Sequence, residues 1–258
     1  MKKYYSSFGV WIADEKGEYR GVITFDSPSY NTKTHCRLKL ELKPIIHKSL
    51  KKHLKGPTKV YIEQTVKGPD TYEQFFEYGY FFSNGFVYED EIGDLKSVVF
   101  SKDKISSIKE KRKNLFIKAA PVPEFREGES GTPEICDDKQ SFVFKINGYK
   151  NVYDYDFKAK YAIGDILKIK NSLSARVADS EIILSIADIK CKRLQDITPQ
   201  ECIAYGVDRN VYLDEGEDFC RKIFSSLWNS KLSSKQKKAL SWEANPWVLL
   251  YEFESIKK

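Results

Sequence analysis

The stretch between residues 192 and 253 constrains the fold more than any other part of this 258-residue chain. Within it, DITPQE gives a sharp helix start, because the hydroxyl of Thr198 can cap the first turn while Glu201 reaches back to it. Pro199 suits the first helical position, and Gly206 suits a C-terminal stop. The pattern predicts a short helix with two well-defined ends.

Two further elements follow in the same stretch. A second helix is expected over residues 217–229, where an apolar stripe at helical spacing is formed by Phe219, Ile223, Phe224 and Leu227. A strand is expected over residues 247–253, directly after Pro246. The last part of the sequence is therefore predicted to run helix, helix, strand.

The N-terminal part reads as β-rich. Residues 5–42 carry β-branched and aromatic residues in near alternation, broken by turn-prone segments, which predicts a meander of strands. Residues 44–56 place apolar side chains at helical spacing among lysines, so we expect one amphipathic helix, followed by another strand. The acidic segment 89–94 then marks a boundary between a first domain, 1–95, and a second, 96–258.

Aromatic residues are dense between residues 71 and 90, on either side of an SNG turn that predicts a hairpin. Aromatic side chains in sheets commonly fill a core. They can also form a platform on which nucleic-acid bases stack. The sequence leaves both interpretations open.

The middle of the chain combines strands with one helix. We expect the helix within residues 100–118 and a mobile surface loop over residues 124–140, which are rich in Gly, Ser, Pro and acids. Residues 162–173 and 180–194 predict two apolar strands.

Basic residues are clustered rather than spread evenly. The formal net charge is +6, residues 43–59 contain six lysines and no acid, and residues 102–118 contain seven basic residues against two acidic ones. Such runs favour a polyanionic partner electrostatically. They are also typical of a helix face that is simply solvated.

Several classes of protein are disfavoured. No apolar run approaches the roughly 20 residues needed to span a bilayer, and the N-terminus lacks the apolar stretch of a signal peptide, so we expect no membrane contact and a cytoplasmic location. The five cysteines form no CxxC pair and the three histidines lie away from carboxylates at ligand spacing, so no metal site, disulfide or cofactor is expected. The histidines are His35, His47 and His53.

Three motifs taken together resemble one protein family. They are RLQDITPQECIAYGV at 193–207, FSSLWNS at 224–230 and SWEANPWVLLYEF at 241–253. They resemble the C-terminal part of ASCH-domain proteins, a branch of the PUA-like β-barrels, and particularly those of bacteriophages and prophages. Residues 100–123 are similar to that family's opening helix and basic turn, and Gly164-Asp165 to its turn before a barrel strand. The likeness covers about residues 98–253 and leaves the N-terminal domain without a family.

The resemblance implies an α+β fold in which a closed, curved sheet of five or six strands is covered at one end by helices. It also implies a ligand cleft between the basic turn and the following helix. Proteins with this fold bind RNA or modified nucleotides, and one bacterial branch hydrolyses N4-acetylcytidine with a lysine, a threonine and a glutamate. Those three positions fall on Lys113, Phe116 and Tyr205.

At two of the three catalytic positions, the residue of this chain cannot perform the role of the family's residue. Phe116 has no hydroxyl, and the phenol of Tyr205 is a poor general base near neutral pH. A nearby arginine position of the family holds Lys118, which keeps the charge but loses the bidentate fork. We therefore expect no catalytic residues and a binding site with basic side chains on phosphate and aromatic rings against a base. The predicted site residues are Arg112, Lys113, Phe116, Lys118, Asp165 and Tyr205.

The sequence thus predicts a non-catalytic, phage-type protein that binds RNA, another single-stranded nucleic acid or a modified nucleotide through a PUA-like cleft. A structural alternative is that Phe116 and Tyr205 only fill a decayed pocket. A second alternative is an enzyme acting on a modified base or nucleotide, in which Lys113 works with Asp165 or Tyr205. A third is a counter-defence protein whose aromatic N-terminal half binds a host protein.

Overall fold

The computed structural model describes residues 5–13, 19–27, 56–83, 85–110, 114–122, 125, 130–147, 152–171 and 182–257. The chain divides into two compact units. The first, called unit 1 below, comprises Met1–Val99, Ile166–Ser185 and Glu254–Lys258, and the second, unit 2, comprises Phe100–Asp165 and Ile186–Phe253. The chain first passes from unit 1 to unit 2 after Val99, close to the predicted domain boundary at residue 95. The two later segments of unit 1, however, belong to the predicted second domain.

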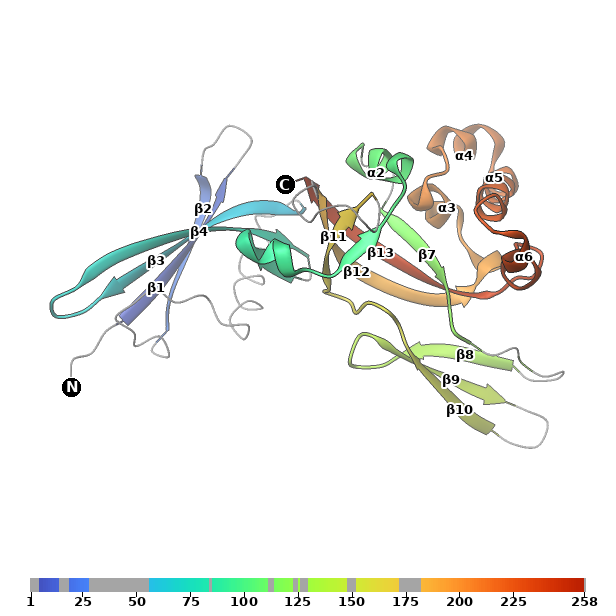
Figure 1. Cartoon of the computed structure of the whole chain (residues 1–258), viewed down its shortest axis with the longest axis horizontal. Coiled ribbons are helices and arrows are strands. Elements are labelled where there is room, and N and C mark those ends of the chain that lie inside the picture. The colour runs from blue at the N-terminus through green and yellow to red at the C-terminus, as the bar shows by residue number, and fades with distance from the viewer. Residues whose placement is uncertain are drawn as a thin grey trace. The chain divides into compact units, whose positions relative to one another are not determined.

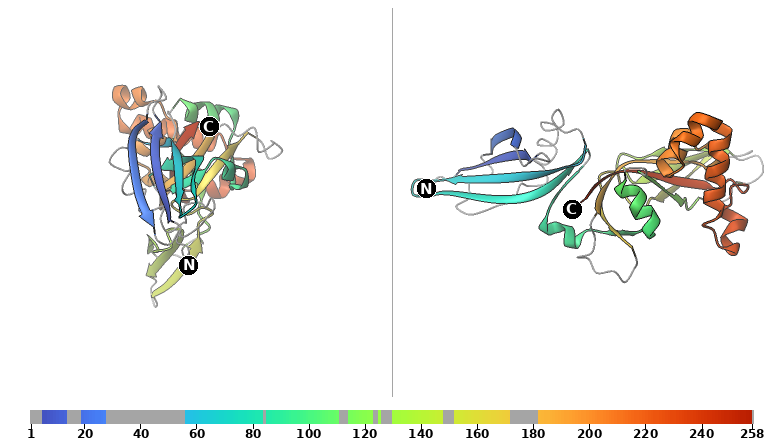
Figure 2. Two further views of the ribbon diagram at one scale, coloured as in Figure 1. Left: turned by 90° about the vertical axis from the view of Figure 1, so that its left-hand side faces the viewer. Right: turned by 90° about the horizontal axis from the view of Figure 1, so that it is seen from above.

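Unit 1 contains a five-stranded antiparallel sheet in the order β2-β1-β3-β4-β5. Its long blue and cyan strands lie side by side in Figures 1 and 2. The strands are β1 (Tyr5–Ala13), β2 (Tyr19–Ser27), β3 (Thr58–Lys67), β4 (Tyr72–Phe82) and β5 (Gly85–Tyr88). The structure confirms the predicted strand before the aromatic segment and the hairpin within it.

One face of this sheet is buried and the other is more exposed, as strand alternation requires. On β1 and β3 the buried side chains recur at every second position, shown by Val10, Val60 and Ile62, each at most 3% exposed. The end of β4 is buried on both sides, and Gly79 is needed there because an added Cβ would lie 2.4 Å from the Phe86 ring. A second cluster, supported by Ile183 from the later segment of unit 1, includes Tyr80, Phe82, Val87 and Ile92.

Some predictions fall outside the described residues. These are the last part of the predicted meander, residues 28–42, most of the lysine-rich helix over 44–56, all three histidines, and the basic turn at 111–113.

A second five-stranded sheet has the order β6-β11-β12-β13-β7, and a three-stranded sheet has the order β10-β9-β8. The strands are β6 (Ser97–Val99), β7 (Leu115–Ala119), β8 (Ser130–Ile135), β9 (Ser141–Asn147), β10 (Val152–Lys158), β11 (Ile166–Lys170), β12 (Ile182–Arg193) and β13 (Trp247–Lys257). Within the described ranges each sheet is open, because its order begins and ends at strands that are not bonded to each other. The fold is α+β as predicted, but the closed barrel implied by the family resemblance is not observed there.

The predicted mobile loop over residues 124–140 is partly wrong. Its second half forms β8, which pairs with β9 from Ser130↔Asn147 to Ile135↔Phe142. Gly and Pro content predicts a loop locally, whereas the pairing with β9 supplies backbone hydrogen bonds that no local pattern reveals. Gly131 fits this strand because an added Cβ would lie 3.0 Å from the Phe125 ring.

The helices of unit 2 confirm the strongest local signals. The described helices are α2 (Lys102–Lys109), α3 (Pro199–Tyr205), α4 (Arg209–Glu215), α5 (Glu217–Asn229) and α6 (Ser234–Leu240). Two short 3-10 turns are also described, η3 (Asp90–Asp94) in unit 1 and η5 (Leu194–Asp196) in unit 2. Figure 1 shows α3 to α6 gathered in one group. Apolar side chains of α3, α4 and α5 pack with one face of β7 and β13 in a cluster that includes Leu115, Ile117, Tyr205, Phe224 and Leu250.

The start of α3 is the capping box that the sequence predicts. The Thr198 side-chain oxygen accepts a hydrogen bond from the Glu201 N–H at 3.2 Å, and the Glu201 carboxylate accepts one from the Thr198 N–H at 2.8 Å. We expect Thr198→Ala to lower the free energy of unfolding by about 1 kcal/mol, because one backbone donor loses its partner. Thr198→Ser keeps the hydroxyl and should cost much less. Urea denaturation followed by circular dichroism measures both, and equal losses for the two variants would contradict the capping role.

Candidate functional site: a lysine cluster beside Tyr205

Tyr205 is the last residue of α3 and is only 5% exposed. Its ring packs edge-on against Phe224 of α5, with ring centroids 5.1 Å apart. Burial raises the pKa of the Tyr205 phenol to about 12. The phenol is therefore neutral at physiological pH and does not supply a general base.

Lys231 lies directly against this tyrosine. It follows α5, and its backbone N–H donates to the Trp228 carbonyl at 3.1 Å, which fixes the turn after the helix. Its ammonium donates a hydrogen bond to the Tyr205 hydroxyl at 2.6 Å and lies 4.1 Å from the centre of the ring. As a whole the residue is exposed, although its ammonium is partly buried. The cation is thus held by a neutral phenol and an aromatic face.

The ammonium groups of two further lysines, Lys104 and Lys118, affect pKa values in this part of unit 2. Burial lowers the pKa of Lys231 to about 8, with a further contribution from the ammonium of Lys104 on α2. Burial also lowers the pKa of Lys104, with a further contribution from the ammonium of Lys118 on β7. Like charges disfavour each other's protonated form in this way. The three lysines, on α2, on β7 and in the turn after α5, are therefore linked pairwise by like-charge repulsion, and they are called the lysine cluster below.

Other lysines of unit 2 show a different arrangement. Lys190 donates to Glu252 at 2.7 Å, and this bond raises its pKa. Lys192 forms an ion pair with Glu201 at 3.0 Å. None of the ion pairs formed among the described residues includes a member of the lysine cluster. The cluster therefore holds positive charge that the described carboxylates do not neutralise by direct contact.

The chain just after the predicted basic turn is bonded to α3. The N–H of Asn114 donates to the Ala204 carbonyl at 3.1 Å, and the Asn114 carbonyl accepts from the Phe253 N–H at 2.9 Å. Ala204 is the neighbour of Tyr205. The predicted phosphate contacts Arg112 and Lys113 precede Asn114 in the sequence and lie outside the described residues.

Phe116 does not have the predicted role. Its side chain is 2% exposed and lies in a ring cluster, stacked on Tyr251 at 4.8 Å and edge-on to Phe100 at 5.5 Å. Successive side chains of β7 point to opposite faces of the sheet. Leu115 and Ile117 pack with the helices and Tyr205 on one face, so Phe116 lies on the opposite face. The prediction that both rings flank a bound base is therefore wrong.

Asp165 has a structural role in the turn before β11. Its carboxylate accepts a hydrogen bond from the Ala162 N–H at 3.1 Å. Gly164 before it has a φ of 93°, a conformation that strongly favours glycine, and its N–H donates to the Ile186 carbonyl at 2.8 Å. The predicted Gly-Asp turn is present, and its acid stabilises the turn itself.

Of the predicted site residues, Tyr205 contacts Lys231, and Lys118 lies near enough to Lys104 to lower its pKa. Lys104 and Lys231 were not predicted. Lys104 lies within the basic run that the sequence singled out, but the run offers no means of choosing one lysine. Lys231 follows the predicted helix 217–229 and has no sequence signal of its own. Its position depends on how α5 packs against α3, which is a tertiary property.

The described residues give no support for a metal site or a reactive thiolate. No group of His, Cys, Asp and Glu among the described residues could hold a metal ion. Burial raises the pKa of the thiols of Cys191 and Cys202 to about 12, so neither thiol is a reactive thiolate at neutral pH. No described helix is both long enough and apolar enough to cross a membrane.

Comparison with known proteins yields no relative. No family model, no curated protein and no solved structure matches this chain.

Proposed function

We propose that unit 2 binds a single-stranded nucleic acid or a nucleotide, with phosphate groups held by Lys104, Lys118 and Lys231. The observation that carries this proposal is the lysine cluster, in which the ammonium of Lys118 lowers the pKa of Lys104 and that of Lys104 lowers the pKa of Lys231, while no described carboxylate forms an ion pair with any of the three. Such a site is stabilised when an anion enters it. Single strands offer several phosphates at once, and strong binding through lysine side chains is typical of them.

Tyr205 contributes to this site by positioning Lys231. Because the ring is 5% exposed, it has little surface for a base, whereas its hydroxyl and its face both hold the ammonium. Phosphate recognition rather than base stacking is therefore the proposed source of affinity. The ligand class follows from charge, and the proposal includes no preference for a particular base.

We also propose that unit 2 is related to the ASCH branch of PUA-like domains, which would imply a phage or prophage source and RNA in the host cytoplasm as the ligand. The supports are the capped helix α3, the helix α5 and the terminal strand β13, which follow in the order of the three motifs. The Asn114–Ala204 bond, which joins the start of β7 to α3, is a further support. Amidohydrolase chemistry is not proposed, since the Phe116 ring is buried and the Tyr205 phenol is no base at neutral pH.

The pH dependence of binding tests this function. Lys231 is protonated below its pKa of about 8 and loses its proton above it, and a bound phosphate should raise that pKa toward its ordinary value. Affinity for a fluorescein-labelled oligoadenylate should therefore fall about tenfold between pH 7 and pH 9. Fluorescence anisotropy at low salt gives the dissociation constants.

Lys231→Gln should bind more weakly at pH 7 and lose most of this pH dependence. Lys235→Gln is the matched control, because it removes the same charge from an exposed position on α6. It should keep both the affinity and the fall with pH. If Lys231→Gln and Lys235→Gln bind alike across the range, or if no oligonucleotide binds to the unsubstituted protein, the proposed function is wrong.

A further inference from the structure

The aromatic residues between 71 and 90 divide into two groups. Tyr80, Phe81, Phe82 and Tyr88 are each 1% exposed and belong to the core of unit 1. In contrast, Tyr72, Phe76 and Tyr78 on β4 are 64%, 51% and 48% exposed. The two interpretations left open by the sequence thus apply to different residues, since the first group packs and the second group presents rings to solvent.

The exposed rings are ordered by the neighbouring strand. Tyr61 on β3 is paired in register with Tyr78, and its ring lies 5.2 Å from that of Tyr78. It also stacks on Phe76 with centroids 5.3 Å apart and an angle of 6° between the planes. Large apolar side chains grouped on a surface commonly mark a binding site. Because the rings already support one another, a partner would meet a preorganised surface.

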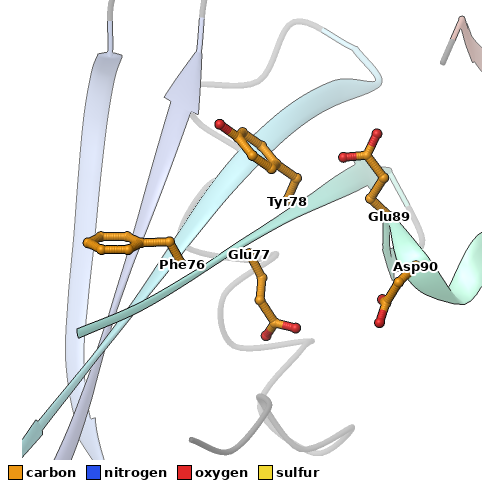
Figure 3. Close-up of a pocket in the computed structure, with 5 residues that line it drawn as sticks. All are labelled: Phe76, Glu77, Tyr78, Glu89 and Asp90. Atoms are coloured by element: carbon orange, nitrogen blue, oxygen red, sulfur yellow. The ribbon is translucent and has the colours of Figure 1, made fainter. Parts of the chain in front are cut away.

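A hollow of about 370 Å³ lies beside these rings and is lined by Phe76, Glu77, Tyr78, Glu89 and Asp90. Figure 3 shows Tyr78 and Glu89 directed toward the same side of β4, and Glu77 directed toward the other. Three of the five lining side chains are carboxylates and none is basic. Such a combination of rings and negative charge suits a cation and repels phosphate.

A cation of the chain itself already uses part of this surface. The ammonium of Lys59 lies 4.7 Å from the centre of the Tyr78 ring and 5.6 Å from that of Tyr80. It also lies 3.3 Å from both oxygens of Glu89, which in turn accepts a hydrogen bond from the Tyr80 hydroxyl at 3.2 Å. Lys59 shows which chemistry this surface accepts, which is a cation held between aromatic faces and a carboxylate.

We propose that this face of unit 1 binds a basic segment of a partner protein, with an arginine or lysine side chain placed on the exposed rings of Phe76 and Tyr78 beside Glu89. Arginine fits best, because its planar guanidinium can stack on a ring while donating to a carboxylate. The Glu89 carboxylate, on the same side of β4 as Tyr78 (Figure 3), supplies the complementary charge. A single-stranded nucleic acid could stack on the same rings, but its phosphates would lie close to the Glu89 carboxylate.

Binding of a fluorescein-labelled hexa-arginine peptide tests this proposal, with a hexa-citrulline peptide as the uncharged control. The unsubstituted protein should bind the first peptide and not the second. Tyr78→Ala and Glu89→Gln should each weaken binding at least fivefold. Lys59→Gln should strengthen binding about threefold, because it removes the internal cation that competes for Tyr78 and Glu89.

Tyr72→Ala is the matched control on the same strand, since Tyr72 is 64% exposed but does not line the hollow. Its affinity for the peptide should equal that of the unsubstituted protein, and circular dichroism should show that all four variants are folded. Peptide binding that is unaffected by Tyr78→Ala, or weakened by Lys59→Gln, would overturn the proposal. So would an oligoadenylate that binds in place of the peptide with the same dependence on Tyr78.

Discussion

Phe116→Ala is expected to lower the free energy of unfolding by about 3 to 5 kcal/mol, the range found when a buried phenylalanine is truncated. The ring is 2% exposed and lies within 6.1 Å of four other rings, measured between centroids. These rings are Phe100, Tyr161, Tyr251 and Phe253. Removing the ring loses its burial and leaves a cavity that fixed neighbours on β7 and β13 cannot readily fill.

Urea denaturation followed by far-UV circular dichroism measures this loss, and two variants serve as controls. Phe219→Ala makes the same substitution at a position on α5 that is 38% exposed, so it should cost less than about 1 kcal/mol. Phe116→Leu keeps most of the apolar volume and should cost about 1.5 kcal/mol or less. Equal losses for Phe116→Ala and Phe219→Ala, together with weaker oligoadenylate binding by the former alone, would restore the predicted ligand role of Phe116.

The error at Phe116 has a sequence explanation. Leu115, Phe116 and Ile117 form a continuous apolar run, and such a run in a strand indicates burial on both faces. The structure shows this arrangement, since Leu115 and Ile117 pack with the helices while Phe116 packs with the rings on the other face. The family resemblance assigned a ligand role to a position that the local pattern assigns to the core.

Local signals predicted the helices with the greatest accuracy. The helix α5 has the predicted bounds, and α3 begins at Pro199 as predicted and ends at Tyr205, directly before the expected stop at Gly206, because a capping box and a C-terminal glycine act within a few residues. The predicted apolar stripe of α5 is only partly right, since Phe219 and Leu227 are 38% and 36% exposed while Cys220, Phe224 and Trp228 are buried. The helix α6 was missed although Ser233 and Gln236 form a capping box, since its lysine-rich sequence has no apolar stripe. The strand β8 was missed because its partner lies across a turn.

The candidate site was less predictable than the fold for the same reason. Lys118 and Tyr205 were found because the family resemblance assigns an arginine and a glutamate to their positions. Lys231 owes its position to a hydrogen bond to a residue 26 positions earlier, which no periodicity encodes. The division of the aromatic segment into core and surface rings likewise depends on the register of β4 with β3 and β5.

The triple variant Lys104→Gln/Lys118→Gln/Lys231→Gln is expected to lose most of the affinity for single-stranded RNA. If each phosphate contact contributes about 1 kcal/mol, three lost contacts weaken binding on the order of 100-fold at low salt. The dependence of the logarithm of affinity on the logarithm of salt concentration should also become shallower by about 2, since each phosphate contact on a single strand adds roughly 0.7. Anisotropy titrations between 50 and 200 mM salt would measure both quantities.

The matched control is the triple variant Lys235→Gln/Lys237→Gln/Lys238→Gln, which removes the same total charge from exposed positions on α6. A loss of affinity shared equally by the two triple variants would mean that net charge alone attracts RNA.

The stability of the first triple variant gives a second test. The pKa values of Lys104 and Lys231 are lowered in the folded protein, so the protonated forms are disfavoured there relative to the unfolded chain. Removing these charges should therefore leave the melting temperature at pH 7 unchanged or raise it. Weaker binding without a loss of stability is the result expected if these lysines are maintained for an anionic ligand.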